Sequence, residues 1–222
     1  MSHDNKRSIS LYSYQDEYYD GKLDLEGCLR ETAKTGATGV ELLAEQMIKK
    51  FPNPIEDEAF RANWFAMLDK YNLVPSCYDA FLENRIFSNR TLSLGEQVNM
   101  MKRDIRLAHL LGFPVLRTLV STPMDVIEGS LDYAEEMNVK IGLEVHAPFS
   151  LNSGWADGYM EMINRTGTKF SGLMVTSQAS PMAQQLAGMS VGLAATAVSV
   201  LALFNAAGRG ASPSSECPGG KL

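Results

Sequence analysis

The strongest constraint on the fold is an alternation of short apolar segments with amphipathic segments of helical period, repeated through the first 175 or so residues. The apolar segments have the length and composition of β-strands and lie at residues 9–14, 39–43, 74–81, 115–120, 139–146 and 170–175. Apolar residues at helical spacing fall between them, at residues 23–35, 56–71, 92–111, 123–137 and 154–166. This alternation predicts a parallel sheet covered by helices.

The connections differ at the two ends of the predicted strands. Short turns containing Gly or Asn lead from helix to strand, as at Asn72, Gly112 and Asn138, where a left-handed residue ends the helix. The loops that follow the strands are longer and polar, for example residues 13–22 and 83–91. In a parallel barrel that end carries the chemistry, so we predict an α/β fold of the (β/α) TIM-barrel type. An open doubly wound sheet is the alternative, but no glycine-rich phosphate motif follows the first strand.

The composition excludes several classes of partner. The chain has 222 residues, 45% of them hydrophobic, which is enough for a sizeable core. Its formal charge of -6 disfavours nucleic acid and anionic membrane surfaces and fits a small neutral or metal-bound ligand better. The three cysteines, Cys28, Cys77 and Cys217, are far apart and suggest neither a disulfide framework nor a zinc site. With a polar N-terminus at residues 1–7, these features predict a reducing, cytoplasmic setting.

The composition changes near residue 170. No charged residue lies between Lys169 and Arg209, and residues 186–208 form an almost wholly apolar run long enough to span a bilayer. Residues 209–222 are rich in Gly, Ser and Pro, which is typical of disorder. We therefore predict a partial barrel over residues 1–175, truncated after about six strands, then an apolar, transmembrane-like helix within 176–208 and a disordered tail at 209–222.

Two candidate catalytic residues end the fifth predicted strand. Glu144 and His146 are two residues apart, so strand alternation points both side chains into the barrel. A carboxylate there suits Mn²⁺ or Mg²⁺, and an imidazole can bind a metal, donate to a sugar oxygen or move a proton. The alternative is an ion pair or a hydrogen-bonded core histidine.

Further charged residues occupy corresponding places on the neighbouring strands. Glu41 ends the second predicted strand, Asp79 lies near the end of the third, and Arg117 lies in the fourth. Because a charge inside a barrel costs several kcal/mol unless it is paired or used, we predict that these side chains converge with Glu144 and His146 in one polar substrate-binding pocket. The alternative is a purely structural salt-bridge network. Tyr12 would add an aromatic wall for a sugar.

Four segments carry a resemblance to a known family: residues 8–17 (SISLYSYQDE), 36–42 (GATGVEL), 103–113 (RDIRLAHLLGF) and 141–148 (IGLEVHAP). Together they resemble the xylose-isomerase-like TIM barrels of the sugar phosphate isomerase/epimerase group, over about residues 8–175. In that group Glu, Asp, His and Glu from strands five to eight hold a divalent metal, Mn²⁺ or Mg²⁺, that polarises a sugar carbonyl. Glu144 matches the first ligand, whereas residues 176–180 contain no Asp. The resemblance therefore implies a weakly held or absent metal and impaired activity.

The apolar run carries a second, shorter resemblance. Residues 188–209 resemble one transmembrane helix of a major facilitator transporter, in which Gly-Arg opens the cytoplasmic loop. A natural fusion, a rearranged reading frame or a chimera would each join such a segment to a barrel.

These observations support two hypotheses of different classes. The first is a sugar or sugar phosphate isomerase or epimerase that acts on a small-molecule sugar by metal-assisted proton transfer next to a carbonyl. The second is a non-catalytic barrel remnant or chimera that binds a small ligand or a partner chain, as a homo-oligomer or with membrane contact through residues 186–208. An endonuclease of the same superfamily would need a basic DNA-binding face, which the acidic composition disfavours.

Overall fold

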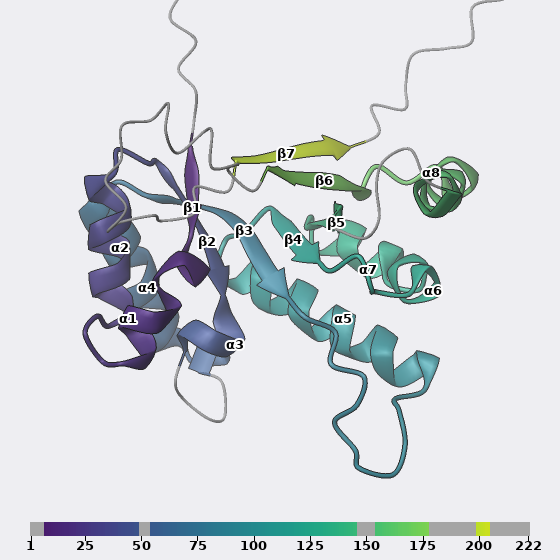
Figure 1. Cartoon of the computed structure of the whole chain (residues 1–222), viewed down its shortest axis with the longest axis horizontal. Helices are drawn as coiled ribbons and strands as arrows, with labels where there is room; N and C mark the ends of the chain where they lie inside the picture. Colours follow the sequence, from purple (N-terminus) through teal and green to yellow (C-terminus); the bar gives the residue numbers. More distant parts are fainter. Residues whose placement is uncertain (1–6, 49–53, 146–153, 178–198, 205–222) are drawn as a thin grey trace, which may run out of the picture.

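In the computed structural model, the described residues are 7–48, 54–145, 154–177 and 199–204. Six parallel strands follow one another in the sheet in chain order. They are β1 (Ser8–Ser10), β2 (Gly39–Leu43), β3 (Val74–Ala80), β4 (Val115–Thr118), β5 (Lys140–Val145) and β6 (Ser171–Ser177). A seventh strand, β7 (Ser199–Phe204), pairs antiparallel with β6 (Figure 1).

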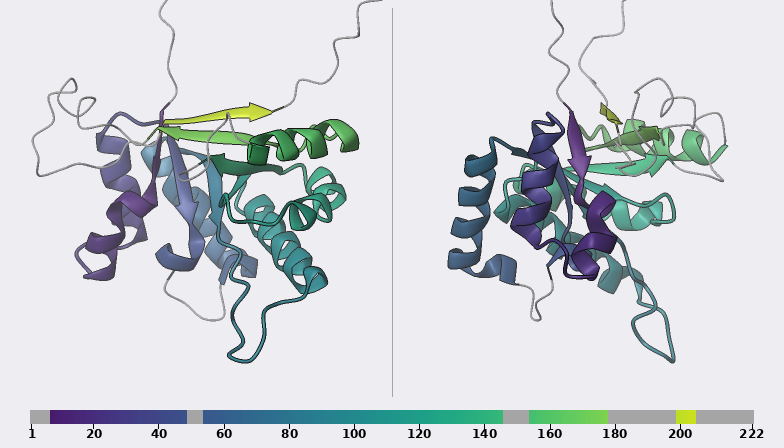
Figure 2. Two further views of the ribbon diagram at one scale, coloured as in Figure 1. Left: turned by 45° about the vertical axis from the view of Figure 1, so that its right-hand side comes forward. Right: turned by 60° about the vertical axis from the view of Figure 1, so that its left-hand side comes forward.

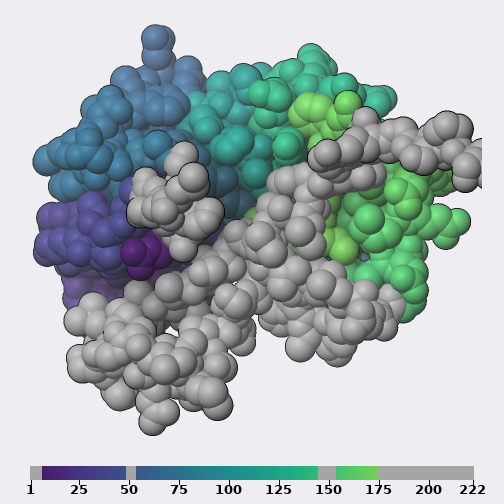
Figure 3. Space-filling view, turned by 90° about the horizontal axis from the view of Figure 1, so that it is seen from above, coloured from purple at the N-terminus to yellow at the C-terminus, as the bar shows by residue number. Residues whose placement is uncertain are grey.

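Helices connect the parallel strands on the outside of the curved sheet (Figures 1 and 2). The longer ones are α2 (Leu25–Lys34), α4 (Glu58–Tyr71), α5 (Leu94–Leu110) and α8 (Gly154–Thr166). Shorter elements are η1 (Leu11–Tyr14), α1 (Gln15–Tyr19), α3 (Ala44–Met47), η2 (Pro54–Glu56), α6 (Met124–Glu128) and α7 (Leu131–Glu136). In the space-filling view, the N-terminal elements and the α8 region lie on opposite sides of the molecule (Figure 3).

Local sequence signals account for where several helices begin and end. Asp24 caps α2 by accepting a hydrogen bond from the Gly27 amide, and Ser93 forms a capping box with Glu96 at the start of α5. Asn72 ends α4 with a φ of 51°. Asparagine tolerates this left-handed conformation better than most residues, so the predicted helix-to-strand turn is present.

The fold is that of a (β/α) barrel, as predicted, with two local differences. The predicted strand at residues 9–14 is shorter, because Leu11–Tyr14 turn into the 3-10 helix η1. The predicted helix at residues 123–137 is divided into α6 and α7 at Gly129 and Ser130. A Cβ on Gly129 would lie 3.0 Å from Val98 of α5, so the glycine permits close packing where the helix breaks.

The hydrophobic core lies between the sheet and its helices. Trp64 of α4 is fully buried against Phe113, with ring centroids 5.9 Å apart, and Tyr78 of β3 meets Phe113 edge-on at 5.8 Å. The Trp64 indole donates to the carbonyl of Leu111 at 3.2 Å, which satisfies its polar atom. This cluster anchors the two central helices α4 and α5 to the sheet.

The barrel interior is polar near β1, β2 and β3. The β2–β3 register shifts between Val40 and Glu41, which leaves Ser76 as an extra residue on β3. The Ser76 hydroxyl donates to the Val40 carbonyl at 2.8 Å and contacts the Ser8 hydroxyl. After this bulge, Glu41 lies opposite Cys77, and Leu43 lies opposite Asp79.

The C-terminal prediction is wrong where the structure tests it. Residues 199–204 belong to the run predicted as an apolar helix, yet they form β7 along the edge of β6 and approach β1. An unpaired strand edge offers a row of backbone donors and acceptors, and their pairing outweighs local helix preference. Residues 178–198 and 205–222, which hold the rest of the predicted apolar helix and the predicted disordered tail, lie outside the described residues. Among the helices that are described, none has the length and apolar character needed to cross a membrane.

Candidate functional site

Four charged side chains from four adjacent strands meet inside the barrel. Arg117 of β4 donates through Nη2 to Asp79 Oδ2 of β3 at 2.7 Å. Its Nη1 lies 3.8 Å from Glu41 Oε2 of β2 and 3.7 Å from Glu144 Oε1 of β5. Strand alternation accounts for the cluster, because each residue occupies an inward position. We call these four residues the interior cluster.

The side chains of the interior cluster are buried, so ionising them costs free energy. Glu41 and Asp79 are each 1% exposed, and Glu144 is 8% exposed. Three carboxyl groups surround one guanidinium, so full ionisation would leave a net negative charge in a poorly solvated site. Glu41 Oε2 and Asp79 Oδ1 have no hydrogen-bond partner among the described residues.

The pKa values of the cluster reflect this crowding. Burial, followed by the negative charge of Asp79, raises the pKa of Glu41 to about 8, although Arg117 acts in the opposite direction. Burial also raises the pKa of Asp79 against the opposing effect of Arg117. For Arg117, burial lowers the pKa, but the charges of Asp79, Glu41 and Glu144 outweigh burial and hold it above its usual range.

The other two predicted site residues have different outcomes. Tyr12 lies in η1 with 47% of its surface exposed, and its amide donates to Ser10 Oγ at 3.4 Å. Its place beside a sugar stays a prediction. His146 lies outside the described residues, so its predicted role also stays a prediction.

Sequence reasoning missed two interior residues. Ser10 is buried and its hydroxyl donates to Asp79 Oδ2 at 3.5 Å, so it supports the carboxylate that Arg117 binds. Met174 of β6 is 1% exposed and packs over Gly142, two residues before Glu144. Alternation along β1 could have indicated Ser10, whereas Met174 had no signal that separated it from ordinary core residues.

The described residues do not fit a divalent metal by themselves. Within those ranges no group of three His, Cys, Asp or Glu side chains is arranged to hold an ion. The Glu144 carboxylate is instead directed at a guanidinium, which repels a metal cation.

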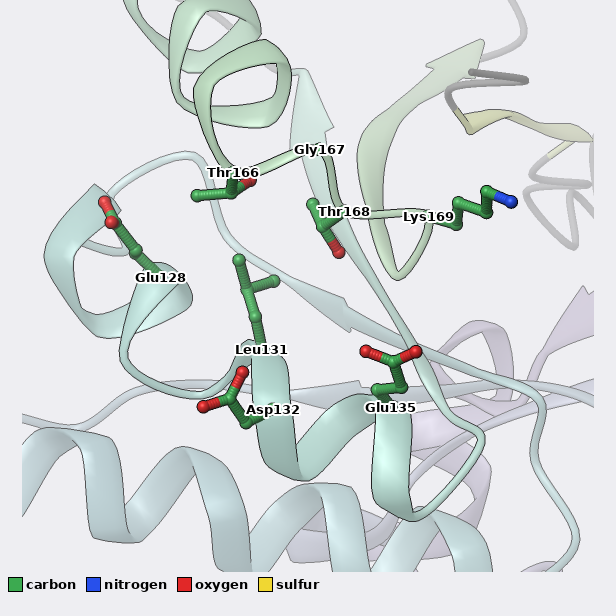
Figure 4. Close-up of a pocket in the computed structure, with 8 residues that line it drawn as sticks. All are labelled: Glu128, Leu131, Asp132, Glu135, Thr166, Gly167, Thr168 and Lys169. Atoms are coloured by element: carbon green, nitrogen blue, oxygen red, sulfur yellow. The ribbon is translucent and has the colours of Figure 1, made fainter. Parts of the chain in front are cut away.

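A cavity of about 460 Å³ lies elsewhere on the molecule (Figure 4). Glu128, Asp132 and Glu135 line it from the α6–α7 side, and Thr168 and Lys169 line it from the turn before β6. This turn precedes the strand, so the cavity lies at the end of the barrel opposite the interior cluster. That end of a (β/α) barrel usually serves stability.

Parallel strands covered by helices, with three carboxyl groups and an arginine directed inward, define a (β/α) barrel with a polar interior. No protein-family model matches the chain. The chain is 31% identical over 142 residues to the C-glycoside deglycosidase alpha subunit of Arthrobacter globiformis, covering 64% of this chain and 38% of that protein. It is 26% identical over 167 residues to the 3'-dehydrocarminate deglycosidase alpha subunit of Microbacterium sp., covering 75% and 47%. The chain thus spans less than half the length of these relatives.

Solved structures show the same fold. D-psicose 3-epimerase in the presence of D-fructose matches with a TM-score of 0.55 at 14% identity, covering 83% of this chain and 66% of that one. The IOLI protein with a zinc atom matches with a TM-score of 0.52 at 19% identity, covering 76% and 61%. A sugar phosphate isomerase/epimerase from Parabacteroides distasonis matches with a TM-score of 0.50 at 12% identity, covering 79% and 67%. At these identities the likeness establishes the barrel fold and leaves the reaction open.

Proposed function

We propose that this barrel binds a sugar and removes and returns a proton at the carbon next to the sugar's carbonyl group. The observation that carries the proposal is the interior cluster, in which Arg117 stands between Asp79, Glu41 and Glu144. The carbonyl of a bound sugar would face Arg117, and Glu144 would face the neighbouring C–H bond. The names of the relatives and structural neighbours, which include sugar epimerases and deglycosidase subunits, agree with a sugar ligand.

The proposed step needs a base and a positive group. Glu144 takes the proton from carbon, and the electron pair of the broken C–H bond moves to form an enolate whose oxygen carries the negative charge. Arg117 stabilises that charge, an effect commonly worth about 10²- to 10³-fold in rate for one preorganised contact. If the proton held by Glu144 exchanges with solvent before a deuteron returns to the same carbon, the step gives isotope exchange. Protonation of that carbon on its other face gives an epimer. Protonation of the former carbonyl carbon, with transfer of the neighbouring hydroxyl proton to the enolate oxygen, gives an isomer.

Solvent exchange tests the step without requiring net turnover. Incubated with D-fructose in D₂O, the protein is expected to introduce deuterium at the carbon next to the carbonyl, measured by proton NMR. Glu144→Gln should slow the exchange by about 10²- to 10⁴-fold, the usual contribution of a positioned base. Glu128→Gln, which changes a carboxylate at the opposite end of the barrel, is the matched control and should exchange at the wild-type rate. Equal rates in Glu144→Gln and wild type would contradict the proposal.

The sequence resemblance implies a divalent metal, and its binding to this chain can be measured. A structural neighbour holds zinc, but the described residues of this chain offer a single matching carboxylate, Glu144. We therefore expect added Mn²⁺ to bind weakly in a calorimetric titration, because a hard cation prefers about six oxygen or nitrogen donors. Tight, stoichiometric binding that is lost in Glu144→Gln would show that the metal is held after all.

A second candidate function is a subunit that binds a partner chain. The curated relatives are named as alpha subunits. On this chain, the long β3–α5 connection extends away from the body of the molecule and exposes Ile86 and Phe87 by 57% and 44% (Figure 1). Exposed apolar side chains of this kind favour association. Analytical ultracentrifugation of wild type and Ile86→Asp would distinguish self-association from a monomer.

A further inference from the structure

We propose that Glu41 remains protonated in the folded protein at neutral pH. As a neutral positioning residue, it does not compete for the Arg117 guanidinium, which can then interact with Asp79, Glu144 and the substrate oxygen. The protonation stands on the geometry of the cluster alone. The role of neutral Glu41 in proton transfer on a sugar rests on the proposed function.

Among the described residues, Glu41 lacks a hydrogen-bond donor at one of its two carboxyl oxygens. Glu41 is 1% exposed, and its Oε2 atom has no hydrogen-bond partner in the described part of the chain. The Arg117 Nη1 atom lies 3.8 Å away, beyond normal hydrogen-bond length, whereas Nη2 donates to Asp79 at 2.7 Å. A buried carboxylate with one oxygen that lacks a donor is disfavoured, and a proton removes its charge.

The charges around Glu41 also favour its neutral form. Within the described ranges, the titratable and charged groups near Glu41 are Cys77 and Asp79 from β3, Arg117 from β4 and Glu144 from β5. One guanidinium cannot balance three carboxylates, and Asp79 holds the shortest contact with it. Burial raises the pKa of Asp79 as well, but Asp79 accepts a hydrogen bond from Arg117 at 2.7 Å whereas Glu41 has no such contact with Arg117, so we assign the proton to Glu41. The pKa of about 8 for Glu41, raised by burial and then by Asp79, agrees with this assignment.

Neutral Glu41 has a consequence for Arg117. The Nη1 atom stands between Glu41 and Glu144 at 3.8 and 3.7 Å. An ionised Glu41 would compete for this atom, whereas a protonated one leaves it directed at the negative charge that develops on a bound sugar. Above about pH 8, loss of the Glu41 proton should weaken that interaction.

Infrared spectroscopy of the full chain tests the protonation directly. In D₂O, a protonated carboxyl group gives a carbonyl band that is separate from the bands of ionised carboxylates. We expect the wild type to show this band at pH 7 and to lose it at alkaline pH, and we expect Glu41→Gln to lack it. Asp104→Asn is the matched control. Asp104 is a buried carboxyl group whose pKa is raised by burial to about 6, so it is mostly ionised at pH 7, and this variant should keep the band. Absence of the band in wild type at pH 7 would overturn the proposal, even if no variant folds.

Stability against pH gives a second readout. The folded protein keeps the Glu41 proton up to a pKa of about 8, whereas the unfolded chain releases it near its ordinary value of 4.5, so stability falls as pH rises between these values. Glutamine is an isostere of the neutral acid, so Glu41→Gln should unfold at a urea midpoint that declines less between pH 6 and 8 than that of wild type.

Asp79→Asn should lower the midpoint at every pH in this range, because it removes the carboxyl group that accepts the 2.7 Å hydrogen bond from Arg117. If Glu41→Gln lowers the urea midpoint as much as Asp79→Asn does, the proposal is overturned. If the infrared band is present but sugar exchange is absent, the proposed function fails and the protonation of Glu41 stands.

Discussion

Gly142→Ala provides a sensitive test of packing beneath the interior cluster. A Cβ at Gly142 would overlap the Sδ and Cγ atoms of Met174, and its next neighbour would be Val115 at 3.6 Å. Met174 is 1% exposed, so its side chain must move within an already filled interior. Such overpacking usually costs about 1–3 kcal/mol. Alanine recovers roughly 0.5–1 kcal/mol of backbone entropy relative to glycine. The expected net loss therefore lies between about 0 and 2.5 kcal/mol, with a centre near 1 kcal/mol.

Urea unfolding followed by circular dichroism measures this loss. Gly95→Ala is the matched control, because a Cβ at this exposed position of α5 meets no atom within 4 Å. It should stabilise the protein by up to about 1 kcal/mol through helix propensity. In Gly142→Ala/Met174→Ala, the new methyl group partly fills the space left by methionine, so the two changes should cost less together than their sum. A Gly142→Ala protein more stable than wild type, by as much as Gly95→Ala, would refute the packing argument.

Three further changes test the charges and caps. Arg117→Met is expected to lower the free energy of unfolding by about 3–5 kcal/mol at pH 7, because the buried carboxylates lose their cation, and by less at acid pH, where those groups take up protons. Ser93→Ala should cost about 1 kcal/mol by removing the capping box of α5, and an unchanged urea midpoint would show that the cap is energetically silent. Glu128→Gln breaks an exposed pair with Arg165 and should leave the urea midpoint close to that of wild type, because solvent screens such pairs.

Much of the barrel follows from local sequence signals, and the differences have tertiary causes. The strand at Gly39–Leu43 and the helix at Glu58–Tyr71 lie close to where apolar periodicity predicts them. At the break between α6 and α7, Gly129 packs closely against Val98 of α5, which is distant in sequence. The pairing of β7 depends on the open edge of β6, and periodicity within residues 186–208 carries no information about that edge.

The candidate site shows the same division. Strand alternation predicts that Glu41, Asp79, Arg117 and Glu144 face inward, and the structure brings them together. Their functional roles stay predictions. The unequal sharing of Arg117, with Asp79 at 2.7 Å and the two glutamates near 3.8 Å, depends on strand register and side-chain packing, which single-sequence periodicity does not resolve.

Because of the bulge at Ser76, β3 should tolerate deletion of one residue at some positions and not at others. Pro75 pairs with Val40 and Cys77 pairs with Glu41, so deleting Ser76 would join two residues that already have regular partners and would leave Asp79 facing Arg117. Deleting Tyr78 would instead turn Asp79 toward the helices, because side chains alternate with a period of two. The strand can therefore shorten by one residue during evolution without moving its charge, provided that the loss falls at the bulge.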